Sequence, residues 1–75
     1  MKIIVFGATG GVGKSVVAQA LDAGLEVTAF VRTPSKMDIT HENLKLIQGD
    51  AFNQRDVSAA IVGHDAVVSC LGSNQ

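Results

Sequence analysis

Two short apolar runs in the first third of the chain have the pattern of buried strands. Residues 2–6 (KIIVF) are almost continuously apolar and are followed at once by glycine, and residues 26–31 (EVTAFV) are rich in β-branched and apolar side chains. Runs of this length that end at turn residues are typical of parallel strands covered on both faces. The sequence therefore predicts a strand at each position.

A helix is predicted between these two strands. Over residues 12–23 the apolar side chains fall at positions 12, 16, 17, 20 and 21, the spacing of one helix face, and Gly24 supplies a left-handed stop. Strand, glycine turn, helix and strand together span the roughly 30 residues of a βαβ unit. Because such crossovers are right-handed, the two strands should lie parallel.

The second half of the chain repeats the alternation of strand and helix. A polar segment with a turn at Pro34 precedes a third apolar run at residues 44–49, and a helix is predicted over residues 53–63 and a fourth strand over residues 65–72. Alternating strands and helices predict an α/β fold with a parallel sheet. A glycine turn after the first strand favours the strand order 3-2-1-4.

This order has two consequences for the expected molecule. The first and fourth strands become neighbours at a topological switch point, where ligands bind beside the carboxyl ends of strands. The sequence ends in the loop after the fourth strand, so we expect residues 1–75 to be part of a doubly wound domain, truncated there. The outer edge of the fourth strand would then carry unused backbone groups, which predicts self-association.

Composition and charge narrow the function classes. The 75 residues allow one domain, and 47% apolar and 17% charged residues are typical of a soluble globular protein without a membrane span. The formal net charge of −1 argues against a nucleic-acid partner. The single cysteine cannot form an internal disulfide, and no secretory signal pattern precedes the first strand. We therefore expect a cytoplasmic protein.

The glycine turn itself, FGATGGVGKS at residues 6–15, supports two interpretations. With glycines at positions 7, 10 and 13 it is a dinucleotide-binding turn, whose backbone amides and helix start hold a pyrophosphate. With Lys14 and Ser15 as ligands it is one glycine short of a triphosphate-binding loop, which also needs an acidic residue after an apolar strand to help hold magnesium.

Residues outside the turn favour the dinucleotide interpretation. Neither the second nor the fourth predicted strand ends in a carboxylate, and Asp50 is separated from its apolar run by Gln48 and Gly49. Arg32 lies 19 residues after Gly13, where folds that bind NAD have an acidic residue. Arginine at that position accommodates the 2′-phosphate of NADP. The alternative is that Arg32 is an ordinary solvated cation.

The sequence resembles the atypical short-chain dehydrogenases/reductases that include NmrA-like proteins and the flavin and biliverdin-IXβ reductases. Four segments carry the resemblance: IVFGATGGVG, GLEVTAFVRTPSK, GD at residues 49–50, and HDAVVSCLG at residues 64–72. The resemblance implies a Rossmann-type domain of which this chain contains the cofactor-binding half. NADP(H) is the expected cofactor, with NAD(H) as the alternative.

The resemblance also implies a set of cofactor-binding positions. The turn that holds the pyrophosphate would comprise Gly7, Thr9, Gly10, Gly11, Val12 and Gly13. The 2′-phosphate would be clamped by Arg32 and Lys36, the adenine edge would be contacted by Asp50 and Ala51, and the ribose or nicotinamide side would pass near Leu71 and Gly72. Asp50 has a second interpretation, in which it helps Asn53 cap the following helix.

Three functions remain open at this stage. The resemblance implies hydride transfer from NADPH to a flavin, quinone or small carbonyl acceptor. Family members place the substrate pocket and catalytic residues in the half that is absent here, so we assign no catalytic residue and expect little activity from this chain alone. A non-catalytic NADP(H) sensor of the NmrA type is the second function, and a P-loop ATPase is the third. His41 and His64 lie in polar loops with no cysteine or carboxylate at metal-ligand spacing, so no metal site is predicted.

Overall fold

The computed structural model of the chain describes residues 1–70. Four strands and two α-helices alternate, with a single 3₁₀ turn after the second strand. In chain order the elements are β1 (Lys2–Phe6), α1 (Gly11–Asp22), β2 (Glu26–Val31), η1 (Pro34–Lys36), β3 (Leu44–Gln48), α2 (Gln54–Ile61) and β4 (Ala66–Ser69).

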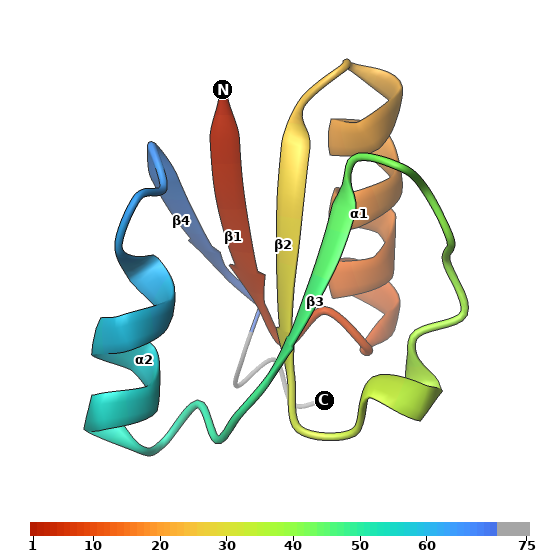
Figure 1. The fold of residues 1–75 in the computed structure, drawn as a ribbon. Helices are drawn as coiled ribbons and strands as arrows, with labels where there is room; N and C mark the ends of the chain where they lie inside the picture. The colour runs from red at the N-terminus through yellow and green to blue at the C-terminus, as the bar shows by residue number, and fades with distance from the viewer. Residues whose placement is uncertain (71–75) are drawn as a thin grey trace.

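All strand pairs in the described sheet are parallel, in the order β3-β2-β1-β4. The predicted α/β class and strand order are therefore confirmed. Because the strands run in one direction, their carboxyl ends meet at one edge of the sheet, the lower edge in Figure 1, where the turn from β1 into α1 also lies. Among the described residues, the candidates for binding that the sequence marked lie at this edge.

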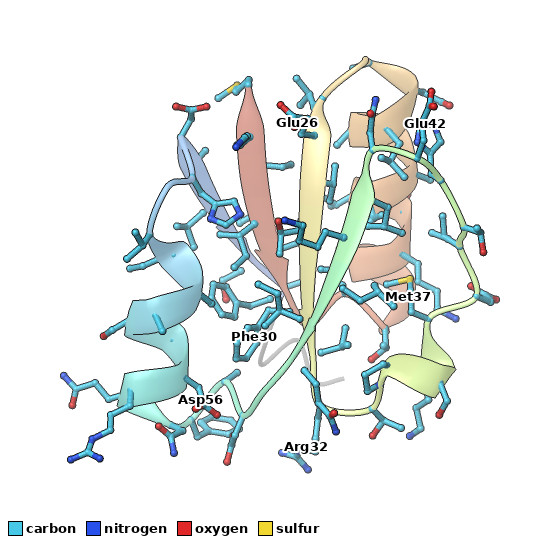
Figure 2. The ribbon with its side chains drawn as sticks, in the orientation of Figure 1. Glu26, Phe30, Arg32, Met37, Glu42 and Asp56 are labelled. Atoms are coloured by element: carbon cyan, nitrogen blue, oxygen red, sulfur yellow. The ribbon has the colours of Figure 1, made fainter. Side chains whose placement is uncertain are left out.

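The two helices cover opposite faces of the sheet, and each face has its own core. On the α1 face, Val17 and Leu21 pack with side chains from β1 and β2 such as Val5. The α2 face has the smaller core, in which Phe30 packs against α2 (Figure 2) and its ring centroid lies 4.8 Å from that of Phe6. Successive side chains along β1 and β2 point to opposite faces, so each of these two apolar strands contributes to both cores.

The element bounds differ from the predicted ones by a few residues at most. Helix α1 begins at Gly11 and ends at Asp22, and Gly24 has the expected left-handed backbone, with φ of 83°. Strand β4 is shorter than predicted because it pairs only as far as Ser69, opposite Phe6 at the end of β1. No helix within residues 1–70 combines the length and the apolar character needed to cross a membrane.

Candidate functional site

The turn from β1 into α1 is built by glycine. Gly7 has a φ of 75°, a left-handed conformation that favours glycine and turns the chain sharply off the strand. The amide of Gly10 donates to the carbonyl oxygen of Gly7 at 3.3 Å, and the amide of Lys14 donates to the carbonyl oxygen of Gly10 at 2.8 Å. The turn is therefore closed by its own backbone.

Gly13 is needed for close packing of the helix against the turn. A methyl group at this buried position would overlap the carbonyl oxygen of Gly7 and lie 2.8 Å from Cα of Ala8. Gly11, by contrast, has no neighbouring atom within 4 Å of a methyl group placed on it. The predicted role of Gly13, bringing helix and strand together, is thus visible in the packing.

The two helices differ at their amino ends. In α2 the Asn53 side chain accepts hydrogen bonds from the amides of Arg55 and Asp56, and Asp56 places a carboxylate in the first turn. Helix α1 has no side-chain cap at Gly10 and no acidic residue in its first turn. Its first amides and the positive end of its dipole are thus left for an anion, as in a phosphate-binding turn.

A small cavity of about 120 Å³ opens between the turn and the ends of β2 and β3. Ligand pockets usually measure about 300–1,000 Å³, so this cavity would hold only part of a dinucleotide. Four predicted binding residues line it together. The full lining is Gly7, Ala8, Thr9, Phe30, Val31, Arg32, Gly49, Ala51 and Phe52.

Arg32 follows β2 directly and its side chain extends away from the sheet at the carboxyl-end edge (Figure 2). Its backbone carbonyl accepts a 3.4 Å hydrogen bond from Nε2 of Gln48, while the guanidinium has no partner among residues 1–70. Lys36 lies at the end of η1 and is also exposed, but it does not line the cavity. Arg32 is therefore the better placed of the two cations.

Asp50 fixes the loop after β3. Its Oδ1 accepts a hydrogen bond from the amide of Phe52 at 2.9 Å, and its own amide donates a hydrogen bond to Oδ2 of Asp56 at 3.0 Å. The side chain of Asn53 caps α2, whereas the Asp50 carboxylate bonds to the backbone before the helix begins, so the bonds do not support the interpretation in which Asp50 helps to cap α2. The other predicted contacts near the ribose or nicotinamide, Leu71 and Gly72, lie outside the described residues.

Lys14, the residue central to the triphosphate interpretation, does not line the cavity. Its Nζ lies 3.5 Å from Oδ1 of Asp38, in an ion pair on the α1 side of the sheet. In the triphosphate interpretation this side chain would instead contact the β- and γ-phosphates. The geometry favours the dinucleotide interpretation of the turn.

Phe52 is the residue at this site that sequence reasoning missed. Its side chain is 82% exposed, the largest value among the exposed large apolar residues of the described chain, and it lines the cavity. A single aromatic residue in a polar loop has no periodic pattern that marks it. The signal that could have found it is its place two residues after Asp50, at the end of a strand that leads into the site.

A larger cavity, about 510 Å³, lies at the opposite end of the sheet. It is a groove beside the carboxyl end of α2, lined by the first residues of three strands, including Lys2 and Glu26. Within it Nε2 of His64 lies 2.8 Å from Oγ1 of Thr28. Size alone does not make this groove the functional site, because in parallel α/β sheets ligands bind at the carboxyl ends of the strands.

Comparison with known proteins agrees with this geometry. A family model described as NAD(P)H-binding matches residues 7–75. The isoflavone reductase homolog IRL of Zea mays is 34% identical over 99% of the chain, and the photosystem II assembly factor Ycf39 of Cyanophora paradoxa is 36% identical over 91%. A solved Rossmann-fold NAD(P)-binding family protein from Shigella flexneri has a TM-score of 0.85 and 29% identity over 93% of the chain. The chain spans 27%, 22% and 36% of these three proteins, respectively.

Proposed function

Because the chain belongs to the NAD(P)H-binding family, we propose that it forms the NADP(H)-binding part of an oxidoreductase that reduces a flavin, quinone or related small carbonyl acceptor. Residues 1–75 would be one portion of a larger domain, whose remainder supplies the substrate pocket. The observation that carries the choice of NADP(H) is Arg32, whose guanidinium has no partner within residues 1–70 and lies at the cavity that Gly7 and Thr9 also line.

The residues at the site fit this cofactor. The uncapped start of α1 leaves amides at Gly11, Val12 and Gly13 for the pyrophosphate, and the Thr9 hydroxyl can add a hydrogen bond. Arg32, assisted by Lys36, would neutralise the 2′-phosphate. The bound cofactor supplies the hydride, and the role of this chain is to bind and orient it.

The test is calorimetric titration of the chain with NADPH and with NADH, before and after Arg32→Ala. A charge-assisted hydrogen bond contributes about 1.5–3 kcal/mol, so the substitution should weaken NADPH binding roughly tenfold to 150-fold and leave NADH binding nearly unchanged. Arg55→Ala is the matched control, because Arg55 is also an exposed arginine but lies on α2 and does not line the cavity. Equal binding of both cofactors by the unmodified chain would contradict the proposal.

A second candidate function is a cofactor-sensing regulator without catalysis. It is favoured by the similarity to Ycf39, whose name describes an assembly factor. The two functions differ in one measurement, the oxidation of NADPH by the intact protein with and without candidate acceptors. Acceptor-dependent oxidation supports the oxidoreductase. Tight NADPH binding with no oxidation in the presence of flavin, quinone or carbonyl acceptors supports the regulator.

The proposal extends to the partners of this chain. Strand β4 is an edge strand of the described sheet, and its Val67 side chain is 53% exposed. Exposed apolar edge strands are templates for pairing with another chain. We therefore include self-association through the outer edge of β4 in the proposed function.

A further inference from the structure

The exposed ring of Phe52 is unusual in this chain. The two other phenylalanines, Phe6 and Phe30, are 4% and 2% exposed and pack against each other in the core of the α2 face. Phe52 is 82% exposed and belongs to neither core cluster. Of the three phenylalanines, Phe52 is the one that residues 1–70 leave largely exposed.

The loop that carries Phe52 is held in place by hydrogen bonds of its backbone. The amide of Phe52 donates a hydrogen bond to Oδ1 of Asp50 at 2.9 Å, and the amide of Asp50 donates one to Oδ2 of Asp56 at 3.0 Å. The amide of Asn53 donates to the Asp50 carbonyl oxygen at 2.9 Å, and the amide of Gly49 donates to that of Val31 at 3.0 Å. The ring is thus presented at the rim of the cavity without being buried there.

Gly49 fixes the path of this loop over the core. A methyl group at Gly49 would lie 2.5 Å from Cζ of Phe30, so any larger residue here would have to displace that buried ring. This close approach positions the following residues, including Ala51 and Phe52, beside the glycine turn. Both residues line the 120 Å³ cavity together with Arg32.

We propose that Phe52 is the stacking platform for the adenine ring of the cofactor, an inference that rests on the proposed NADP(H) binding. The cavity accommodates only part of a dinucleotide, and its polar lining side chains are those of Thr9 and Arg32. A planar apolar ring at such a site matches the flat face of a purine. Stacking of a base on an aromatic side chain contributes about 1–3 kcal/mol by alanine substitution.

The chain is well suited to a direct optical test of this contact, because it contains no tryptophan and no tyrosine. In a Phe52→Trp variant all indole emission reports on position 52. We expect saturable quenching by 2′,5′-ADP, which contains the adenine and the 2′-phosphate, and no saturable quenching by nicotinamide mononucleotide. Excitation at the red edge of indole absorption avoids adenine. Unchanged emission at 2′,5′-ADP concentrations that saturate binding in calorimetry would overturn the inference.

Affinity provides the second measurement. Phe52→Ala should weaken 2′,5′-ADP binding roughly fivefold to 150-fold, and Phe52→Tyr should retain it. Val62→Ala is the matched control, because Val62 is 75% exposed and does not line this cavity. Circular dichroism checks that each variant is folded. Wild-type affinity in Phe52→Ala contradicts the stacking role.

The outcomes separate this inference from the proposed function. If Arg32→Ala removes the preference for NADPH while Phe52→Ala binds normally, the proposed function stands and the stacking role is wrong. If the unmodified chain binds neither NADPH nor 2′,5′-ADP, both are wrong. If Phe52 instead covers a second copy of the chain, Phe52→Ala will lower the mass measured by light scattering and leave 2′,5′-ADP binding unchanged, which also contradicts the stacking role.

Discussion

At the scale of single residues, the glycines of the turn differ in what they can tolerate. Gly13 has no room for a methyl group, whereas Gly11 has open space around it. We expect Gly13→Ala to lower the free energy of unfolding by about 1–3 kcal/mol, the usual cost of forcing extra atoms into a packed site. Urea unfolding of the free chain measures this change.

Gly11→Ala provides the comparison for that prediction. Alanine is favoured over glycine in a helix by about 1 kcal/mol, and no neighbour opposes it here. Its stability should therefore be unchanged or higher. Equal destabilisation by both substitutions would contradict the close packing of α1 against the turn at Gly13.

The same scale shows which site residues the sequence could reveal. Gly7 and Gly13 belong to a motif whose spacing has a backbone cause, so their places in the turn could be predicted from the sequence. Arg32 lies at a fixed distance from that motif, so its place at the end of β2 could be predicted too, while its cofactor contact stays a prediction. The place of Phe52 could not be predicted, because the loop after β3 brings it to the cavity. The sequence left two roles for Asp50, helix capping and contact with the adenine edge. A carboxylate at a strand end can bond to several nearby amides, and the sequence does not show which one it meets.

At the scale of elements, the contrast between the two helix starts carries the argument for anion binding. Gly10 has a φ of −74° and a ψ of 166°, which other residues adopt, and a methyl group there would lie 3.6 Å from the oxygen of Gly7. Gly10→Asp should therefore be accommodated. It would place a carboxylate where the structure leaves the helix dipole unopposed.

This substitution should have opposite effects on stability and binding. We expect the free energy of unfolding to rise by up to about 1 kcal/mol from the charge at the helix start. NADPH binding should weaken about tenfold or more, since a carboxylate placed next to the pyrophosphate repels it. Gly10→Asn is the neutral control and should weaken binding less. Unchanged NADPH affinity in Gly10→Asp would argue against a pyrophosphate at α1.

The elements were the most predictable level of this chain. The apolar runs of β1 and β2 and the spacing along α1 each specified type and position, because burial on both faces leaves a continuous pattern. The ends were less predictable. Strand β4 ends at Ser69 because its partner β1 ends at Phe6, a tertiary constraint that its own sequence does not contain.

At the scale of the whole molecule, the exposed outer edge of β4 in the described sheet predicts that the chain associates with copies of itself. Val67 pairs in register with Ile4 of β1, so its side chain points to the α2 face, and it is 53% exposed. The mass measured by light scattering should increase with concentration for the unmodified chain. Val67→Lys should hold the mass near that of a monomer, because a charge on an edge strand opposes pairing.

Leu46→Lys is the control for this effect. Leu46 is 40% exposed and lies on β3, the opposite edge strand of the described sheet. The Leu46→Lys variant should associate like the unmodified chain if β4 is the edge strand that pairs. A monodisperse monomer at high concentration of the unmodified chain would remove self-association from the account.

The most direct test of the central claim is an amide NMR titration of the unmodified chain with NADPH. We predict that the largest chemical-shift changes occur at the amides of Gly11, Val12 and Gly13, with further changes around Arg32. The contradicting result is a saturated titration in which these amides do not move and the changes instead lie at the opposite end of the sheet, around Lys2 and Thr28.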